Sequence, residues 1–322
     1  MRACVYDRYG AARDVLRVVD IDRPEPGPGQ VRVRIELSGV NPTDFKSRAG
    51  LTPRPIDGFQ IPHQDGSGVI DAVGPGVDPA RAGERVWVWL AAVGRWGPAA
   101  EYCVIPAEQA SPLPEGATHQ LGACLGVPAM TAHCCLFADG PVSGSSVLVH
   151  AGAGAVGHYA IQLAKRAGAR VATTVSGPDK AALAAAAGAD LVVNYREGGA
   201  LDALRDFARV MDRIIEVNLP ANLDTDLGLA GPGTTVVTYA AALEDPTLPT
   251  RRCMAANVSF RFMLLYGIPR AGLLSAARDI TSAMVEGALS PLPLHRFGLE
   301  EVAAAHEAVE GGAVGKVVLA IG

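Results

Sequence analysis

Three glycines at positions 152, 154 and 157 have the spacing Gly-x-Gly-x-x-Gly. They follow the apolar run 147–149 and precede a helical pattern over 158–165. Glycine at the second position lets a backbone approach a pyrophosphate, and glycine at the third lets the helix pack against the strand. Free N–H groups and the dipole at the helix N-terminus favour phosphate. We therefore predict a dinucleotide-binding loop, with these residues: Gly152, Ala153, Gly154, Ala155, Val156 and Gly157.

The next predicted strand, over 170–175, indicates which dinucleotide binds. An NAD site usually has Asp or Glu near the end of this strand, where the carboxylate binds the ribose 2′-hydroxyl. This chain has Ser176-Gly177-Pro178-Asp179-Lys180 there, and Asp179 comes late enough to be a helix cap instead. Ser176 and Lys180 are suited to a 2′-phosphate. The sequence therefore favours NADPH over NADH.

Length and composition limit the classes of protein that need to be considered. The chain has 322 residues, of which 49% are hydrophobic and 19% charged, and these values are typical of a globular protein with two domains. The net charge of −5 and the lack of a basic run argue against nucleic-acid binding. No apolar run is long enough for a membrane span, and the start has no signal-peptide pattern, so we expect a cytoplasmic protein without a membrane partner.

The predicted elements change in kind near residue 120. Residues before it contain short alternating segments separated by Gly and Pro, such as 31–37, which are typical of a small β-barrel. Segments near 146–151, 170–175, 191–194, 213–217, 234–239 and 258–264 then alternate with helical patterns. This alternation predicts an α/β fold with a doubly wound parallel sheet. A helix near 270–287 and a strand over 316–321 are expected to return to the first domain.

Several motifs together resemble one known family. They are Gly39-Val40-Asn41-Pro42-Thr43-Asp44, Pro62-His63-Gln64-Asp65-Gly66, Gly83-Glu84-Arg85-Val86-Trp87, Gly126-Val127-Pro128-Ala129-Met130-Thr131-Ala132, the glycine loop, Asn194-Tyr195-Arg196, and His306-Glu307 ahead of Gly315-Lys316. Over essentially the whole chain, this pattern resembles the medium-chain dehydrogenase/reductase superfamily, and within it the zinc-free, zeta-crystallin-like quinone oxidoreductases.

The resemblance implies a division into two domains. A GroES-like β-barrel catalytic domain is expected over 1–120 and 266–322, and a Rossmann NADPH-binding domain over 121–265. The active site is expected in a cleft between the two domains. A homodimer is the usual state of the family, and the strand near 258–264 is a candidate for the interface between the two copies.

The residues at the family's metal positions argue against zinc. Zinc-dependent members have Cys where Asn41 stands and His where Gln64 stands, and neither amide is a usual zinc ligand. The four-cysteine structural zinc lobe is also missing, because 89–101 is a short stretch without cysteine. We predict no metal. Without a Lewis acid, reduction of an electrophilic acceptor is favoured over alcohol oxidation.

The resemblance also implies cofactor contacts outside the glycine loop. Ser176, Lys180 and Tyr195 match positions that hold the adenosine 2′-phosphate and ribose, and Thr131 matches a position near the nicotinamide. The remaining matches, which include backbone contacts, are Asn222, Tyr239, Ala240, Ala241 and Ala242, and Met263, Leu264 and Leu265. The family usually has Gly-Ser where Ala240-Ala241 stands, so only backbone contacts are expected there.

Lys46 and Asn41 are the candidate catalytic residues. Well-known quinone reductases of this branch have Tyr at position 46, near the nicotinamide and the acceptor. The lysine here could donate a hydrogen bond to a developing enolate or hydroquinonate oxygen, or serve as a proton donor. It could instead bind a cofactor phosphate or Asp44, or lie in solvent. Asn41 would act as an amide donor at the edge of the substrate.

We therefore expect an NADPH-dependent, zinc-independent reductase that transfers hydride to quinones. Two alternatives stay open at this point. An enone, 2-alkenal or enoyl double-bond reductase would share every motif. The acceptor pocket would distinguish such an enzyme from a quinone reductase, and the sequence does not define that pocket. A non-catalytic, crystallin-type NADPH-binding protein would bind the cofactor without turnover.

Overall fold

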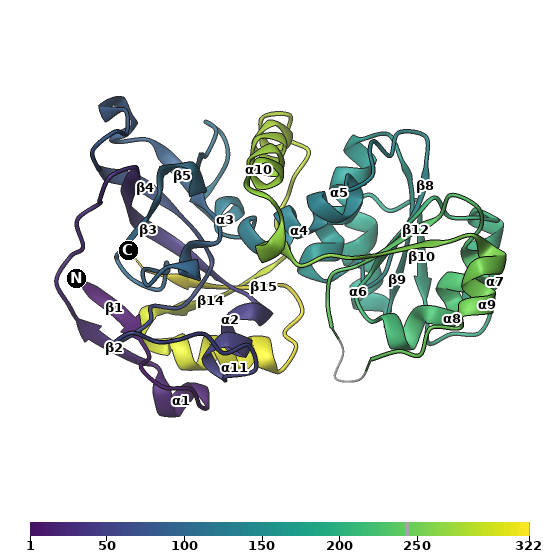
Figure 1. Cartoon of the computed structure of the whole chain (residues 1–322), viewed down its shortest axis with the longest axis horizontal. Helices are drawn as coiled ribbons and strands as arrows, with labels where there is room; N and C mark the ends of the chain where they lie inside the picture. Colours follow the sequence, from purple (N-terminus) through teal and green to yellow (C-terminus); the bar gives the residue numbers. More distant parts are fainter. Residues whose placement is uncertain (242–244, 322) are drawn as a thin grey trace. The chain divides into compact units, whose positions relative to one another are not determined.

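The computed structural model describes residues 1–241 and 245–321. The chain forms two compact units, with unit 1 comprising Met1–Val127 and Pro291–Gly322 and unit 2 comprising Pro128–Ser290. Figure 1 shows unit 1 in purple, blue and yellow, since its last strands come from the end of the chain, and unit 2 in teal and green. Among the described residues, no helix is both long and apolar enough to cross a bilayer.

Unit 1 is built on a sheet in the order β14-β15-β3-β4-β5-β7, with β6 also paired to β3. All of its pairings are antiparallel except β14 with β15. The strands of unit 1 as a whole are β1 (Arg2–Val5), β2 (Arg17–Asp20), β3 (Gln30–Val40), β4 (Asp65–Val73), β5 (Arg85–Val88), β6 (Tyr102–Pro106), β7 (Ala110–Pro112), β14 (Leu294–Gly298) and β15 (Lys316–Ala320). Its helices are α1 (Ala12–Val15), α2 (Pro42–Arg48), α3 (His119–Gly122) and α11 (Val302–Glu310), with short 3₁₀ turns at η1 (Pro79–Arg81), η2 (Ala91–Val93), η3 (Ala107–Gln109) and η5 (Leu299–Glu301).

The core of unit 1 explains why the long strand β3 is central. Side chains such as Val31, Val33 and Ile35 alternate into a buried cluster with strand β4 and strand β6. A second cluster lies between the strand β1 segment, helix α11 and strand β15. Helix α2 follows β3 directly because Asn41 caps it and Pro42 occupies its first turn, and the Asp44 carboxylate accepts the Asn41 backbone N–H at 2.7 Å.

Unit 2 contains a six-stranded sheet that is parallel throughout, in the order β10-β9-β8-β11-β12-β13. Counted along the chain this is the 3-2-1-4-5-6 order of a Rossmann sheet, so the predicted doubly wound fold is confirmed. Its strands are β8 (Ser146–Val149), β9 (Arg170–Val175), β10 (Leu191–Asn194), β11 (Arg213–Glu216), β12 (Thr235–Thr238) and β13 (Ser259–Phe262). Its helices are α4 (Gly126–Leu136, which begins at the unit boundary), α5 (Ala155–Arg166), α6 (Pro178–Ala186), α7 (Ala200–Phe207), α8 (Leu219–Leu229), α9 (Thr250–Ala256) and α10 (Arg270–Val285), and η4 (Leu265–Gly267) is a 3₁₀ turn.

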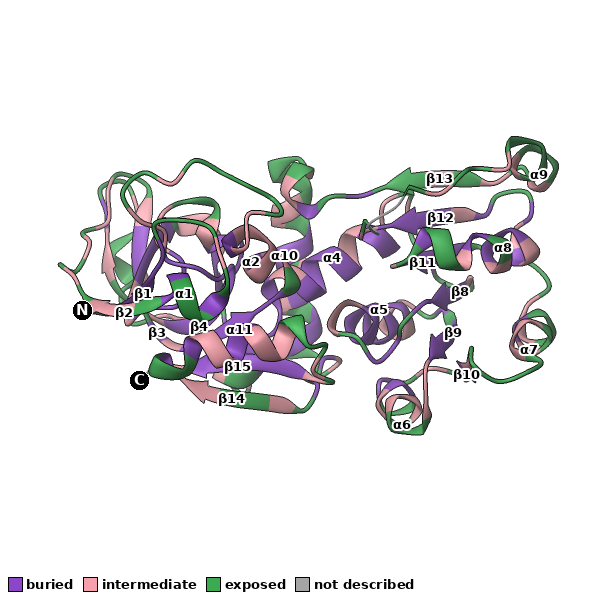
Figure 2. Cartoon of the chain, turned by 90° about the horizontal axis from the view of Figure 1, so that it is seen from below, coloured by how far each residue is buried: buried purple, intermediate pink, exposed green. Residues whose placement is uncertain are grey.

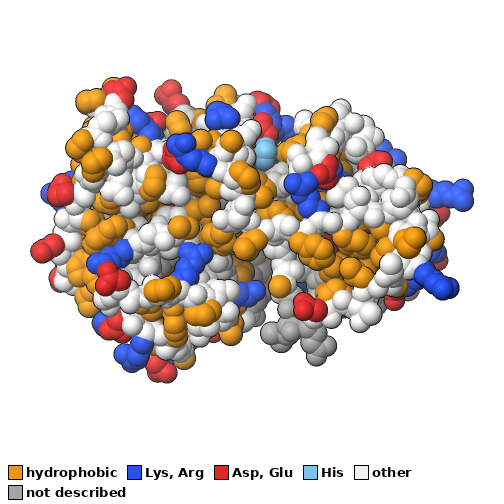
Figure 3. Space-filling model, viewed as in Figure 1, with side chains coloured by type: hydrophobic (Ala, Val, Ile, Leu, Met, Phe, Trp, Pro, Cys, Tyr) orange, Lys and Arg blue, Asp and Glu red, His pale blue; other side chains and the backbone are white. Residues whose placement is uncertain are grey.

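Burial follows the parallel architecture. Figure 2 shows the central strands β8 and β11 in purple, and β8 and β11 are buried except at Ser146, as expected for strands covered on both faces. Strand β13 at the sheet edge is much less buried, because three of its four residues, Ser259, Arg261 and Phe262, are exposed. The face drawn in Figure 3 carries acidic and basic side chains interspersed with each other.

The unit boundaries differ from the predicted residues 120 and 265. The chain passes into unit 2 after Val127 and leaves it after Ser290, so helix α10 belongs to unit 2 and not to the first domain. Helix α10 contacts helix α5 through ion pairs: Arg166 of α5 binds Asp279 of α10 at 2.9 Å and Glu286, the C-terminal cap of α10, at 2.7 Å. Only β14, α11 and β15 return to unit 1. The hydrophobic pattern of a helix did not reveal which core it would pack against.

Candidate active site

The glycine loop has the close packing that its spacing predicts. The Gly154 backbone N–H donates to the Ala151 carbonyl at 2.9 Å, and Gly154 caps helix α5. A Cβ on Gly157 would lie 2.3 Å from the Ala151 oxygen, and one on Gly152 would lie 2.1 Å from Thr173 Oγ1. A larger residue at 152 would therefore push the loop away from strand β9, and one at 157 would push helix α5 away from the loop. The loop lies beside strand β8, at the point where the strand order reverses between β8 and β11, which is where doubly wound sheets bind ligands.

Ser176, Lys180 and Tyr195 lie together at the carboxyl ends of strands β9 and β10. The Lys180 ammonium donates to Ser176 Oγ at 3.0 Å, and the Tyr195 backbone N–H donates to the Val175 carbonyl at 3.1 Å. The Tyr195 side chain is exposed, and Asp179 is exposed in the first turn of helix α6. A hydroxyl and an ammonium thus occupy the place where an NAD site would usually have a carboxylate.

The other predicted cofactor contacts also lie in unit 2. Thr131 is buried in helix α4, and Asn222 is half-buried in helix α8. The Tyr239 N–H donates to the Glu216 carbonyl at 3.2 Å, and the Met263 N–H donates to the Thr238 carbonyl at 2.9 Å, so both segments continue the sheet past its carboxyl edge. The side chains of the three residues after β13 differ, with Leu264 exposed and Met263 and Leu265 buried. Ala240 and Ala241 are described, whereas Ala242 lies outside the described residues.

Unit 1 brings Asn41, Asp65 and Lys316 together in its interior. The Asn41 amide nitrogen donates to Asp65 Oδ2 at 2.7 Å, and the Lys316 ammonium donates to Asn41 Oδ1 at 2.5 Å and lies 3.5 Å from Asp65 Oδ2. Asp65 Oδ1 accepts the Val127 N–H at 2.7 Å. At most 4% of either ionic side chain is exposed. The Asn41 amide is therefore already bound on both of its polar atoms, which weakens the hypothesis that it binds substrate.

A second acidic residue, Asp44, adds to this buried cluster. Burial, and then the nearby Asp65 charge, raises the pKa of Asp44 to about 8. Burial also raises the pKa of Asp65, although Lys316 and Asn41 oppose this shift. The Lys316 ammonium thus lies beside the buried Asp65 carboxyl, and its charge favours the ionised form of Asp65 against the effect of burial.

His63 joins β3 to helix α11 through hydrogen bonds. Its Nδ1 lies 2.7 Å from Ser38 Oγ, and its Nε2 lies 3.0 Å from His306 Nε2. Burial, then His306, then Lys316 lower the pKa of His63 well below its usual value, and burial lowers the pKa of His306 to about 3. Both rings are therefore neutral at pH 7, and they connect elements of the fold.

Lys46 differs from the buried Lys316 in its surroundings. It lies half-buried in helix α2, and its ammonium makes no hydrogen bond or ion pair with any residue that the structure describes. The nearest acidic residue in sequence, Asp44, is engaged by the Asn41 N–H instead. A pocket beside this helix is lined by residues that include Asp44, Ser47, Thr52, Arg54, His63 and Gln64. Gln64 Oε1 is buried without a hydrogen-bond partner in the described part of the chain.

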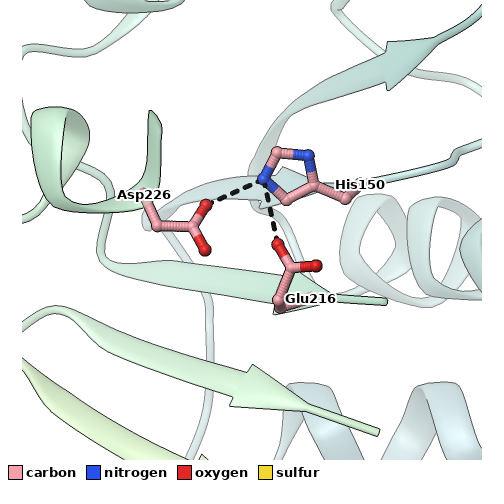
Figure 4. A group of neighbouring side chains, drawn as sticks. All are labelled: His150, Glu216 and Asp226. Atoms are coloured by element: carbon pink, nitrogen blue, oxygen red, sulfur yellow. Dashed lines mark hydrogen bonds and ion pairs between the residues drawn. The ribbon is translucent and has the colours of Figure 1, made fainter. Parts of the chain in front are cut away.

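A cluster in unit 2 that the sequence analysis did not identify contains His150, Glu216 and Asp226 (Figure 4). His150 Nε2 lies 2.9 Å from Asp226 Oδ1 and 3.4 Å from Glu216 Oε2, while its Nδ1 lies 3.0 Å from Thr174 Oγ1. All three side chains are buried. His150 and Glu216 come from the ends of β8 and β11, the two strands at the reversal of strand order.

Hydrogen bonding, not metal binding, explains the spacing of this cluster. Zinc ligands at about 2.1 Å around a tetrahedral ion lie about 3.4 Å apart, and the 2.9 Å contact between His150 and Asp226 is shorter. Glu216 is also bound by two N–H donors, the Asn218 backbone and the Asn222 amide. Among the described residues, this is the group of His, Cys, Asp and Glu whose ligand atoms come close enough for an ion, and it lies in the other unit from Asn41 and Gln64.

The sequence could predict only part of the buried cluster in unit 1 and of the His150 cluster in unit 2. Asn222 and Asp226 are four residues apart on helix α8, and this spacing places them on one face. Their pairing with Glu216 and His150 depends on the strand order, which a single sequence does not give. Lys316 and His306 lie in recognised motifs, but their partners are about 240 to 275 residues away along the chain.

Comparisons with known proteins agree with the two units. A family model described as alcohol dehydrogenase GroES-like domain matches residues 27–115, and one described as zinc-binding dehydrogenase matches residues 155–277. The human protein named quinone oxidoreductase is 30% identical over 324 residues, which cover 99% of this chain and 97% of the relative.

Two solved structures extend the likeness to the whole fold. An NAD-dependent alcohol dehydrogenase superimposes with a TM-score of 0.89 at 28% identity, covering 100% of both chains. A mycobacterial protein complexed with NADPH has a TM-score of 0.85 at 30% identity, covering 99% of this chain and 100% of that one.

A Rossmann-type parallel sheet and a GroES-like unit in one chain define a medium-chain dehydrogenase/reductase. The chain belongs to the quinone oxidoreductase branch of this superfamily, and it is an oxidoreductase that uses a nicotinamide cofactor.

The geometry around Asn41 leads to a prediction about metal. An ammonium from Lys316 already lies against the amide at the position where zinc-dependent members have a cysteine. We expect the purified protein to contain no stoichiometric zinc and to keep its activity after chelation. Elemental analysis of the protein before and after dialysis against a chelator measures this. About one firmly held zinc per chain, lost together with activity, would contradict the prediction.

Proposed function

We propose that the protein is an NADPH-dependent, zinc-independent reductase that transfers hydride to quinones. The observation that carries the cofactor assignment is the hydrogen-bonded pair of Ser176 and Lys180 at the end of β9, with the exposed Tyr195 beside it. These groups suit the adenosine 2′-phosphate, because an ammonium and a hydroxyl form charge-assisted hydrogen bonds with phosphate oxygens. The glycine loop and the start of helix α5 would hold the pyrophosphate.

The acceptor assignment rests on the reaction that the side chains of unit 1 allow. The bound cofactor would supply the hydride. A quinone takes it without a Lewis acid and needs only a donor for the negative charge that develops on oxygen. The unpartnered Lys46 ammonium is suited to that task. The named function of the human relative supports the same acceptor class.

The experiment that tests the acceptor class measures NADPH consumption with quinones, enones and 2-alkenals, and NADPH formation from the oxidised cofactor with simple alcohols. Our proposal expects the highest kcat/KM with quinones and no turnover of alcohols. Faster reduction of enones or 2-alkenals than of quinones would replace the proposal with a double-bond reductase.

Lys180 provides a prediction about cofactor choice. Lys180→Ala should weaken NADPH binding by about 1–3 kcal/mol, because it removes a charge-assisted contact with the phosphate, and should leave NADH binding nearly unchanged. Titration of protein fluorescence with each cofactor measures both dissociation constants. Lys165→Ala, which removes a partly exposed lysine paired with Asp190 on the same unit, is the matched control. Equal loss of affinity for NADPH and NADH would mean that Lys180 does not contact the phosphate.

We also propose that two copies of the chain pair along strand β13. This strand lies at an edge of the unit 2 sheet. Phe262, at its end, is 67% exposed, and Leu264, just after it, is 65% exposed. Phe262→Glu should convert a dimer to a monomer in light scattering, since a charge would enter the apolar seam. Val285→Glu, at an equally exposed apolar position on helix α10, should leave the mass unchanged. An unaltered mass for the Phe262 variant would place the interface elsewhere.

A further inference from the structure

The buried cluster of His150, Glu216 and Asp226 lies directly behind one of the predicted cofactor contacts. The Asn222 amide nitrogen donates to Glu216 Oε1 at 3.0 Å and to Glu216 Oε2 at 3.1 Å. Both carboxylate oxygens therefore face the nitrogen end of the carboxamide. Its oxygen, Oδ1, accepts no hydrogen bond from any residue in the described part of the chain.

Glu216 is itself held in place from several sides. His150 contacts Oε2 from the end of β8, and the Asn218 backbone N–H donates to Oε1. Asp226, from helix α8, holds the imidazole through Oδ1, and its other oxygen is buried without a partner. This is more buried charge than packing requires, since a buried carboxylate costs free energy unless it is hydrogen-bonded.

We propose that Glu216, held by His150 and the Asn218 N–H, is a positioning residue that fixes the Asn222 carboxamide with its oxygen directed away from the carboxylate, to accept a hydrogen bond from the cofactor. This inference rests on the proposed cofactor function and deepens it. An oxygen fixed in this way selects a donor, so the cofactor group that it meets is a hydroxyl or an amide N–H and not a phosphate. Neutral glutamine at 216 could not enforce this, because its own amide can pair with either end of Asn222.

Titration of Glu216 offers a readout in the wild-type protein. Burial, opposed by His150 and assisted by Asp226, raises the pKa of Glu216 to about 7. Burial by itself lowers the pKa of His150, but Asp226 and Glu216 outweigh it and the net pKa is raised. The pKa of the Tyr239 phenol is also raised, by burial, Cys135 and Glu216. A protonated Glu216 donates a hydrogen bond, which lets Asn222 turn its oxygen inward, so cofactor affinity should fall as pH falls through about 7.

The first test is a double-mutant cycle in NADPH binding, measured by fluorescence titration at pH 8. Glu216→Gln and Asn222→Ala should each raise the dissociation constant about five- to tenfold, the effect of one lost hydrogen bond. The double variant should be no worse than Asn222→Ala, because Glu216 acts through Asn222. Asp224→Ala, an exposed residue on the same helix, should change nothing. Effects that multiply in the double variant would overturn the inference.

A second test works even if Glu216→Gln does not fold. Binding of NADH is titrated from pH 8 to pH 6 in the wild type and in Asn222→Ala, because NADH lacks the 2′-phosphate whose own second pKa is about 6. The wild-type dissociation constant should rise as pH falls, and that of Asn222→Ala should stay flat. Parallel curves would overturn the inference. If the wild type bound neither NADH nor NADPH, the proposed function would fail together with it, whereas normal binding with parallel curves would remove the inference alone.

Discussion

Lys316→Met is expected to lower the free energy of unfolding by about 3–5 kcal/mol, the cost of leaving a buried charge without its partner. The Lys316 ammonium is 4% exposed and lies between Asn41 Oδ1 and the buried Asp65 carboxylate. Methionine retains much of the length of the side chain and fills the space, so that the change removes mainly the charge. Urea unfolding monitored by circular dichroism at pH 8 measures the difference from the wild type.

The pH dependence of this loss has a defined sign. Lys316 lowers the pKa of Asp65, so its removal raises that pKa further above the unfolded value. A carboxyl with a raised folded pKa binds protons more readily in the folded state, and stability is therefore regained as pH falls through that pKa. The gap between variant and wild type should be larger at pH 9 than at pH 5.

Two further variants serve as controls. Lys165→Met removes a partly exposed lysine paired with Asp190, and should cost less than about 1 kcal/mol. Adding Asp65→Asn to Lys316→Met should recover much of the lost stability, since it removes the uncompensated charge. A Lys316 variant no less stable than the Lys165 variant would show that the ammonium does not compensate the buried carboxylates.

Lys46→Ala is expected to lower kcat on the order of 10²-fold with NADPH affinity unchanged. The reason is that a donor to a developing oxyanion acts mainly in the transition state. The Lys46 ammonium is free of partners among the described residues, so such a role is open to it. Steady-state kinetics at saturating NADPH, together with fluorescence titration of the cofactor, measure the two quantities separately.

The choice of acceptor and of variant sharpens the Lys46 test. An enone is the more sensitive probe, because its enolate is more basic than a hydroquinonate and needs more help. Lys46→Tyr should restore part of the rate, since a phenol can also donate. Weaker NADPH binding at an unchanged kcat would make Lys46 a cofactor contact, and unchanged values of both with either acceptor type would remove it from the catalytic list.

Much of unit 2 could be predicted from the sequence, because its signals are local. The glycine spacing, the apolar strands and the missing acid after Val175 all lie within a few residues of the groups they describe, and the observed strands fall inside or at the predicted ranges. Helix α10 was assigned to the wrong unit for the opposite reason. Its contacts in unit 2, such as those with Arg166, join residues that are more than 100 positions apart in the chain.

The candidate site in unit 1 was less predictable. Asn41 was chosen because of its position in a motif, but its amide is bound by Asp65 and Lys316, and both contacts span long stretches of sequence. His150 was not among the predicted site residues, and it is buried in the charged cluster behind Asn222. A single sequence shows which residues can bear charge, and only the fold shows which of them compensate one another.

The central claim is hydride transfer from NADPH to a quinone without metal. The most direct measurement follows the absorbance of NADPH and of the quinone together, using protein stripped of metal by a chelator. Our account predicts equimolar oxidation of NADPH and reduction of the quinone at the rate of untreated protein. Binding of NADPH with no oxidation, or oxidation only after zinc is restored, would contradict it.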